Sequence, residues 1–299
     1  MSIIVLGTVA LDTVKTPFGF KKHMLGGSAV HFAMSARLFT TVNLVAIVGK
    51  DFPQQHIEFL RKKGIVLTSL IQDEGKTFKW EGEYRGDLNA ALTLSTELGV
   101  LSAFRPSVSP AQRNIRYLFL ANVDPDIQMH LLKKMRAPRF VGLDSMNYWI
   151  TNKRRALCKL FKEVNIFVAN DQEARELSGE HNLLRAAKKL HSLGPDMILI
   201  KKGEHGVLFY SKQLIFALPA YPTDNVVDPT GAGDTFAGGF MGYLAKAKKF
   251  NTITIKKAIV YGTVAASFNV EDFGINKTAR LTKHDLERRI AYFRKCIVF

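Results

Sequence analysis

Residues 226–240 read VVDPTGAGDTFAGGF, a short run that holds four glycines, two aspartates and two threonines. The order of these residues predicts a tight turn at Gly231, Ala232 and Gly233, followed at once by an apolar helix. The first N–H groups of a helix have no partner within the helix and carry a partial positive charge. Phosphate binds well at such a place, and glycine lets it approach the backbone closely. The run therefore predicts an anion-binding turn.

Asp234 lies in the first turn of the predicted helix, where a carboxylate would repel a bound phosphate. It fits a different task, which is to take the proton from a hydroxyl group that attacks phosphorus. The turn would then stabilise the charge of the phosphoryl group during its transfer. Aspartate is also an ordinary residue at the start of a helix, and that explanation would suffice for an isolated Gly-Asp pair. The complete run favours the catalytic interpretation.

The rest of the chain predicts the elements that hold this turn in place. Short apolar runs rich in branched residues alternate with segments of helical periodicity. Such alternation is typical of a parallel sheet covered by helices on both faces. The predicted strands are 3–6, 43–48, 66–71, 117–120, 139–143, 166–168 and 197–200, with a hairpin at 206–216 and a strand ending near Val227. The predicted helices are 27–39, 54–63, 126–134, 152–161, 171–178, 183–193, 234–245, 255–270 and 283–295.

Residues 77–84, TFKWEGEY, alternate in a way that the apolar strands do not. Phe78, Trp80 and Tyr84 share one predicted face and charged side chains share the other, as in a strand that is covered on one side. A second strand is predicted at 90–94. The aromatic face would pack over a bound sugar or base, or against the same face of a second copy of the chain.

This alternating segment predicts a small insertion in one larger domain. We expect a single domain over residues 1–299, with a β insertion at roughly 71–95 and a short hairpin near 14–24. The turn of the insertion would be Arg85-Gly86-Asp87. Insertions of this kind commonly close over an active site as a lid.

The composition is that of a folded protein, with 47% hydrophobic and 23% charged residues. The formal net charge of +16 fits nucleic-acid binding, attraction of an anionic substrate, or a lysine-rich solvated surface. Basic residues are scattered as pairs such as Lys21-Lys22 and Lys248-Lys249, which favours the solvated surface. Because no dense basic tract or reader motif is present, we expect no nucleic-acid partner.

The sequence predicts neither a membrane-spanning segment nor disulfide bonds. The cysteines Cys158 and Cys296 are far apart in the sequence, which argues against a disulfide framework or a zinc site. No apolar run reaches the roughly 18 residues that span a bilayer. Asp12 interrupts the first apolar stretch, MSIIVLGTVALD, which predicts a strand and not a secretion signal. We expect a cytoplasmic protein with no membrane partner.

The run DPTGAGDTFAGGF resembles the C-terminal signature of the ribokinase-like, or PfkB, family of carbohydrate and nucleoside kinases. Further landmarks of that family follow in order over essentially the entire chain. The resemblance implies a three-layer α/β/α sandwich with a mostly parallel central sheet and a small β lid, with ATP as phosphoryl donor and Mg²⁺ as metal. It implies that Asp234 is the catalytic base, that the amides of Gly231, Ala232 and Gly233 form the anion hole, that Thr230 lies by the nucleotide, and that Asp228 helps to bind a monovalent cation.

The same resemblance assigns residues to the substrate side. In the family, the double glycine that matches Gly26-Gly27 in MLGGSAVHFA lies against the sugar. The family usually has Asn five residues after the first glycine, and here that position is His31, which would donate a hydrogen bond or sit in the core. Asp12 follows the first predicted strand and would accept hydrogen bonds from sugar hydroxyls. Asp144, in GLDSMNYW, would line the cleft.

On the nucleotide side, Asn170 and Glu173 match an N-x-x-E motif that organises the metal and its waters in the family. Oxygen ligands with retained waters suit Mg²⁺, although the same spacing is a common capping pattern. The loop KKGEHG follows the strand at 197–200, and Lys202, Gly203 and Gly206 would lie by the nucleotide. The sequence does not decide which of the two lysines faces phosphate.

These observations predict an ATP-dependent kinase that transfers the γ-phosphoryl group to a hydroxymethyl group of a sugar. The alternative is a nucleoside kinase with a substrate such as adenosine, cytidine or inosine. A third reading is a relative that binds a ligand without catalysis, against which the intact Asp234 and its turn argue. A homodimer through the lids remains open at this stage.

Overall fold

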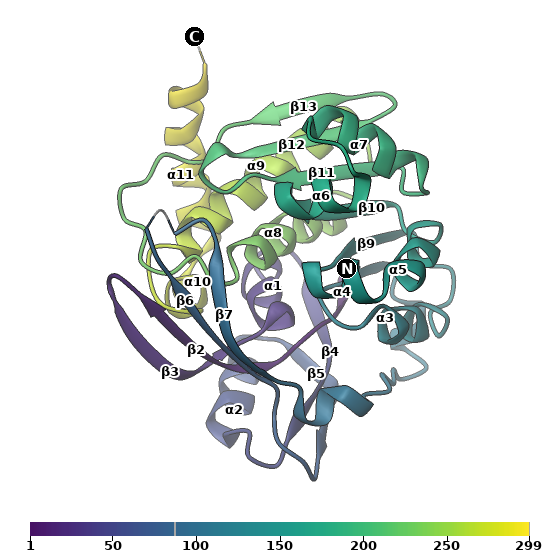
Figure 1. Ribbon diagram of the computed structural model, residues 1–299, viewed down its shortest axis with the longest axis vertical. Coiled ribbons are helices and arrows are strands. Elements are labelled where there is room, and N and C mark those ends of the chain that lie inside the picture. The colour runs from purple at the N-terminus through teal and green to yellow at the C-terminus, as the bar shows by residue number, and fades with distance from the viewer. Residues whose placement is uncertain (87, 299) are drawn as a thin grey trace.

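A computed structural model describes residues 1–86 and 88–298, and a large twisted sheet forms its centre (Figure 1). The strand order is β13-β12-β11-β10-β9-β8-β1-β4-β5. The strands from β11 to β5 in this order are parallel, and β12 and β13 continue the sheet in antiparallel fashion. The bounds are β1 Ser2–Leu6, β4 Thr41–Gly49, β5 Val66–Asp73, β8 Tyr117–Leu120, β9 Phe140–Asp144, β10 Ile166–Asn170, β11 Met197–Lys201, β12 Val207–Ser211 and β13 Ile215–Leu218.

Helices cover both faces of this sheet, because its strands are apolar on both sides and must be buried on both. On one face lie α1 Ser28–Ala36, α2 Gln54–Lys62, α8 Ala232–Ala247, α9 Thr252–Asn269, α10 Asn276–Arg280 and α11 Lys283–Ile297. On the other lie α3 Pro125–Leu132, α4 Asn147–Asn152, α5 Arg154–Phe161, α6 Asp171–Ser178 and α7 Leu183–Ser192. The predicted three-layer α/β/α sandwich is confirmed.

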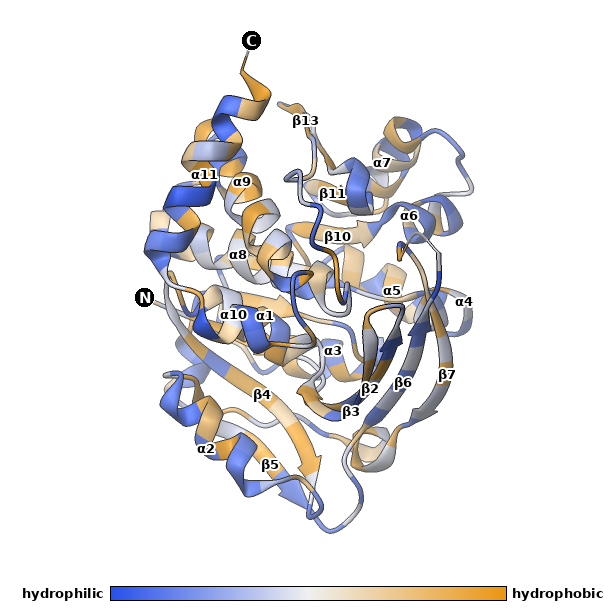
Figure 2. Ribbon diagram, turned by 90° about the vertical axis from the view of Figure 1, so that its left-hand side faces the viewer, coloured by the Kyte–Doolittle hydropathy of each residue, from blue (hydrophilic) through white to orange (hydrophobic). Residues whose placement is uncertain are grey.

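A second, smaller sheet stands beside the main body (Figure 2). Its order is β3-β2-β6-β7, with β2 Ala10–Thr16, β3 Gly19–Gly26, β6 Lys79–Tyr84 and β7 Ala91–Glu97. The central pair β2–β6 is parallel and the outer pairs are antiparallel. The predicted insertion at 71–95 differs from this arrangement, because residues 71–73 complete β5 and half of the small sheet comes from residues 10–26. Asp87 of the predicted turn lies outside the described residues.

One predicted element is wrong, and one helix begins later than predicted. The strand predicted to end near Val227 is absent, since residues 221–230 form no strand. The N–H groups of Val227 and Asp228 donate instead to one carbonyl, that of Val270, at 2.7 and 3.2 Å. The helix predicted at 152–161 is present as α5 and begins at Arg154, because the backbone of Lys153 leaves the helical region (φ −130°) and separates α5 from the preceding short helix α4.

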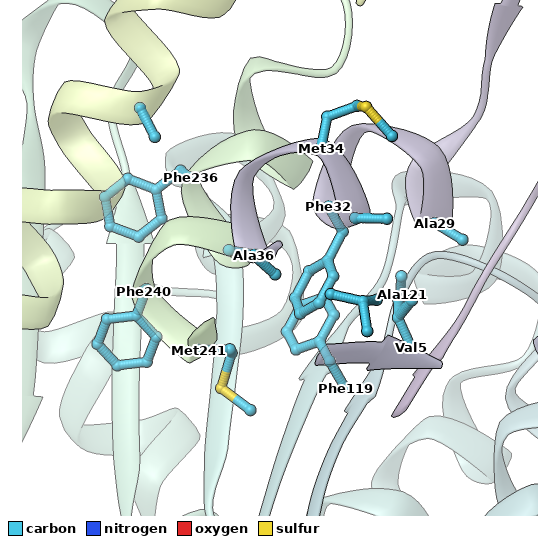
Figure 3. Close-up of a cluster of buried hydrophobic side chains, with 14 of the residues drawn as sticks. Val5, Ala29, Phe32, Met34, Ala36, Phe119, Ala121, Phe236, Phe240 and Met241 are labelled. Carbon is cyan, nitrogen blue, oxygen red and sulfur yellow. The ribbon is translucent and has the colours of Figure 1, made fainter. Parts of the chain in front are cut away.

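The start of α8, which carries Asp234, is held by close packing of α8 against α1 (Figure 3). Phe32 of α1 stacks on Phe119 of β8 with ring centroids 4.7 Å apart, and both side chains are fully buried. A Cβ added at Gly238 would overlap the carbonyl of Phe32, so only glycine permits this approach of the two helices.

Within the described residues, no helix is both long and apolar enough to cross a membrane.

Candidate active site

The carboxyl ends of neighbouring strands bring several charged side chains together. Asp144 ends β9 and Lys201 ends β11, and their Oδ2 and Nζ atoms lie 3.1 Å apart. Asn170 ends β10, the strand between them. A Cβ added at Gly233 would lie 2.8 Å from Nζ of Lys201, so the lysine also rests against the turn that precedes Asp234. Open α/β sheets bind their ligands at this edge.

The charges at this edge set the pKa of Asp234. Burial and the charge of Asp144 raise the pKa of Asp234 to about 7, although the charge of Lys201 opposes both effects. Burial lowers the pKa of Lys201, but the carboxylates of Asp144, Glu173 and Asp234 outweigh burial and leave it above its ordinary value. Lys201 therefore stays charged, while Asp234 titrates near neutral pH, where a general base is most effective.

The turn before Asp234 presents free backbone donors. Gly231 is the N-cap of α8 with φ 73°, in the left-handed region that favours glycine. The N–H of Ala232 donates to the carbonyl of Pro229 at 3.1 Å. Among the residues that the structure describes, no acceptor receives the N–H groups of Gly231, Gly233 or Asp234. The available donors are therefore these three and not that of Ala232.

Asp228 fixes the turn from behind and is fully buried. Its Oδ1 accepts from the N–H of Thr230, and its Oδ2 accepts from the N–H of Gly274, both at 2.9 Å. The hydroxyl of Thr230 lies 3.4 Å from the hydroxyl of Tyr84, which ends β6 of the small sheet. Asp228 thus ties the turn to the segment after α9, and Tyr84 brings the small sheet against it.

Asp12, Gly26 and Gly27, three of the residues predicted to bind the phosphoryl acceptor, lie together. Oδ2 of Asp12, on β2, accepts from the N–H of Gly27 at 3.1 Å. A Cβ added at Gly26 would overlap the carboxylate of Asp12, which requires glycine there. Burial raises the pKa of Asp12 to about 7. The hydrogen bond from Gly27 lowers this pKa, and the charges of Asp228 and Asp234 raise it. The dependence on Asp234 places the two carboxylates within electrostatic reach of each other.

His31 lies behind the turn and is almost completely buried. A Cβ added at Gly231 would overlap its ring, and its Nδ1 lies 3.1 Å from Oδ1 of Asn269. Burial lowers the pKa of His31. Of the two possibilities that the sequence left open, the structure shows the hydrogen-bonded core histidine.

Asn170 and Glu173 form a capping box at the start of α6. Each side chain accepts from the backbone N–H of the other at 2.7 Å, so the capping interpretation holds. Burial and the charge of Asp144 raise the pKa of Glu173. Glu173 also contributes to the pKa of Lys201, which puts it at the same edge of the sheet as Asp144.

The loop after β11 separates the two adjacent lysines. Lys201 pairs with Asp144, whereas the N–H of Lys202 donates to the carbonyl of Gly206 at 2.8 Å to close the loop. Gly203 and Gly206 have φ 55° and 82°, so both need glycine's freedom. Nδ2 of Asn89, beyond β6, donates to Glu204 of this loop at 3.0 Å. The structure thus brings Lys201, and not the predicted Lys202, to the carboxylates.

Comparison with known proteins identifies this arrangement. The model of the pfkB family carbohydrate kinases matches residues 3–280, so the chain belongs to that family. It is 32% identical to the cytidine kinase of Thermococcus kodakarensis over 248 residues, covering 81% of this chain and 87% of that protein. It is 24% identical to a nucleoside kinase of Methanocaldococcus jannaschii over 83% of this chain and 80% of that protein.

Solved structures share the fold over nearly the whole length. The crystal structure of Methanocaldococcus jannaschii nucleoside kinase matches with a TM-score of 0.77 at 22% identity, covering 97% of this chain and 98% of that one. The aminoimidazole riboside kinase of Salmonella enterica matches with a TM-score of 0.78 at 20% identity, covering 97% and 100%. Family and relatives together make the protein a phosphotransferase with an alcohol acceptor, of the sugar and nucleoside kinase class.

The contact between Gly231 and His31 can be tested by Gly231→Ala. We expect the melting temperature to fall by roughly 5–10 °C, because alanine at positive φ costs about 1–2 kcal/mol and its methyl group overlaps the ring. Gly64→Ala is a matched control, since Gly64 has φ 77° and a Cβ there meets no atom within 4 Å. The control should lose only about 2–4 °C. Equal losses in calorimetric scans would contradict the position of the His31 ring.

Proposed function

We propose that the chain transfers the γ-phosphoryl group of ATP to the hydroxymethyl group of a nucleoside, with Asp234 as general base. One observation carries this proposal: Asp234, with a pKa of about 7, lies at the start of a helix whose N–H groups at Gly231, Gly233 and Asp234 are unpaired within the described chain. A base next to unpaired backbone donors suits a reaction in which a hydroxyl attacks and negative charge builds up.

In this mechanism the acceptor hydroxyl lies between Asp12 and Asp234. Its oxygen attacks the γ-phosphorus and forms the new P–O bond, while the bond to the bridging oxygen of ATP breaks and ADP leaves. Asp234 takes the hydroxyl proton. The N–H groups of Gly231, Gly233 and Asp234 donate to the transferred group, and Lys201 keeps the pKa of Asp234 low enough for the base to be ionised. The chain's own work is positioning and charge stabilisation.

ATP and Mg²⁺ are proposed from the neighbours and from the donor set. The Salmonella enterica kinase was solved with an ATP analogue, and a structure assigned as ribokinase II from E. coli holds ATP and Mg²⁺. Within the described residues, no group of three or more His, Cys, Asp or Glu could enclose a metal. That fits Mg²⁺, which commonly binds through waters, substrate phosphates and one or two carboxylates, here Glu173 with Asn170 beside it. Mg²⁺ would neutralise phosphate charge.

Other parts of the proposal rest on the family resemblance. A monovalent cation at Asp228 stays a prediction, since both carboxylate oxygens already accept backbone N–H groups. Thr230, Gly203 and Gly206 stay as predicted nucleotide contacts. A cytoplasmic location stays a prediction as well, in keeping with the unpaired cysteines Cys158 and Cys296.

A nucleoside acceptor is favoured by the surface next to the acceptor residues. Asn122 follows β8, and its carbonyl accepts from Oγ of Ser28, the residue after Gly27, at 3.4 Å. Met146 and Tyr148 follow β9 and are exposed, at 36% and 55%. An amide beside an exposed thioether and aromatic ring is a combination that suits a flat heteroaromatic base. A sugar without a base would leave this surface unused.

The amide of Asn122 is held in one orientation. Nε1 of Trp149, which can only donate, lies 3.1 Å from Oδ1 of Asn122. The NH₂ group therefore points the other way, where its neighbour is the weak acceptor Sδ of Met146 at 3.2 Å. Gln128, fully buried, donates to the carbonyls of Ala121 and Asp144 at 2.9 and 3.1 Å and so fixes the spacing of the two loops. Asn122 thus offers a donor to a base with a carbonyl or ring nitrogen.

The base assignment is tested by Asp234→Asn, which keeps the side-chain shape. We expect kcat to fall by roughly a thousandfold, because the proton acceptor is lost, while ATP affinity changes by less than about threefold in calorimetry. Wild-type kcat should fall below a pH of about 7, since protonation of Asp234 removes the base, and rise to a plateau above it. A variant with more than about a tenth of wild-type turnover would exclude Asp234 as the base.

The acceptor class is tested by Asn122→Asp with cytidine, adenosine, inosine and D-ribose as acceptors. We expect kcat/KM for the best nucleoside to fall by about 10- to 100-fold, because the donor is replaced by an acceptor, while ribose phosphorylation stays within about threefold. Asn114→Asp is the control, an exposed amide whose Nδ2 donates to the carbonyl of Pro110 at 3.3 Å. Wild-type preference for ribose over every nucleoside would contradict the nucleoside proposal.

A homodimer through the small sheets is the proposed assembly. The edge strand β7 exposes Leu92 and Leu94, each at 51%, and the opposite edge exposes Phe20 at 48%. Exposed apolar residues on a sheet edge favour pairing with another copy. Leu94→Lys should shift sedimentation from dimer to monomer at micromolar concentration. A wild-type protein that sediments as a monomer would refute the dimer.

A further inference from the structure

Asn269 is a fully buried amide that ends α9 and touches three parts of the site. Its Nδ2 donates to the carbonyl of Thr230 at 2.7 Å. Its Oδ1 accepts from the hydroxyl of Thr235 at 2.9 Å and lies 3.1 Å from Nδ1 of His31. Thr230 precedes the turn, Thr235 follows Asp234, and His31 lies behind Gly231. One side chain therefore contacts both ends of the turn and its back wall.

These contacts fix the orientation of every group involved. A carbonyl only accepts, so the NH₂ group of Asn269 must face Thr230 and the oxygen must face Thr235 and His31. Because that oxygen only accepts, His31 must carry its proton on Nδ1. Burial lowers the pKa of His31 and favours this neutral form. Its Nε2 then holds a lone pair that has no partner among the described residues.

The hydrogen bond to Thr230 determines where a catalytic donor points. The carbonyl of Thr230 and the N–H of Gly231 belong to the same planar trans peptide, in which the two groups point in opposite directions. Asn269 holds the carbonyl toward the interior, so the N–H of Gly231 is directed outward. The His31 ring, packed against Gly231, prevents the peptide from turning inward. The direction of this donor is thus set by Asn269, a fully buried residue that contacts the turn from its interior side.

We propose that Asn269 is a positioning residue for phosphoryl transfer, which directs the N–H of Gly231 at the transferred group, with His31 as the wall behind it. The inference rests on the proposed function, since it assigns a task to the donors that the function requires. Asn269 acts through the Thr230–Gly231 peptide and not on the substrate. Its loss should therefore affect the transition state more than binding of ATP or acceptor.

Asn269→Asp tests this, because it keeps the shape and the acceptor for Thr235 and His31 but places an oxygen against the carbonyl of Thr230. We expect kcat to fall by about 30- to 300-fold, with KM for ATP and acceptor within about threefold. Gln112→Glu is the matched control, a buried amide whose Nε2 lies 3.4 Å from Oδ1 of Asn43 near the start of β4. It makes the same change of amide to acid at the opposite edge of the sheet and should retain kcat within about twofold.

A second measurement separates positioning from stability. ADP with aluminium fluoride mimics the planar phosphoryl group, and calorimetry should show that Asn269→Asp weakens its binding by at least about tenfold while ADP alone binds as in the wild type. If Asn269→Asp does not fold, the neutral Asn269→Ser replaces it under the same criteria. A kcat within about threefold of wild type, or equal loss for ADP with and without fluoride, would overturn the proposal.

The two proposals fail in distinguishable ways. Wild-type protein that turns over no acceptor and binds neither ADP nor its fluoride complex would refute the proposed function. Wild-type activity together with a fully active Asn269→Asp variant would leave that function intact and remove only the role of Asn269.

Discussion

The site depends on one half-buried ammonium group, that of Lys201, among several buried or half-buried carboxylates. Lys201 contacts Asp144 and lowers the pKa of Asp234, which burial and Asp144 raise. Carboxylates that are close together and out of water tend to protonate, and a protonated Asp234 accepts no proton. Because Lys201 ends a central strand of the sheet, its position is fixed by the fold and not by a flexible loop. The balance of charge therefore follows from strand order.

Gly26, Gly231 and Gly233 are required for packing within the protein as well as for ligand access. The sequence suggests that they let a ligand approach the backbone. In the structure, the space of their missing side chains is used by the protein's own groups: the Asp12 carboxylate at Gly26, the His31 ring at Gly231 and Lys201 Nζ near Gly233. Each of these glycines therefore admits a polar side chain to the back or side of the ligand site. Even a methyl group at such a position would displace a residue of the site as well as narrow the entrance.

The elements that could be predicted from sequence are those specified locally. Residues 117–120 and 171–178 match β8 and α6 because an apolar run and a capped amphipathic segment carry their own boundaries. The strand predicted to end near Val227 is absent although branched apolar residues favour strands in general, because the N–H groups of Val227 and Asp228 bond to the Val270 carbonyl and not to a neighbouring strand of the described chain. Asp234 and its turn were predictable because their chemistry is contained in one short run.

What could not be predicted depends on contacts between distant segments. Which of Lys201 and Lys202 faces Asp144 depends on where β11 ends relative to β9. That arrangement is known only once the strand order is known. Asn269 belongs to no motif in the sequence, and its role appears only when α9 packs against the turn. Asn269 is separated in sequence from His31 by 238 positions and from Thr230 by 39, so only the folded chain brings these groups together.

The small sheet also reaches the site, through two hydrogen bonds made by the end of β6 and the residues just beyond it. Tyr84 reaches Thr230, whose carbonyl Asn269 holds, and Asn89 reaches Glu204 in the loop after β11. Both contacts come from this one segment. Its movement would therefore disturb the turn and the loop after β11 together. Burial raises the pKa of Asp234 to about 7, and any water that the small sheet excludes from the carboxylates favours the same shift. If the small sheet moved away from the turn, water would reach Asp234 and return its pKa toward that of an ordinary aspartate.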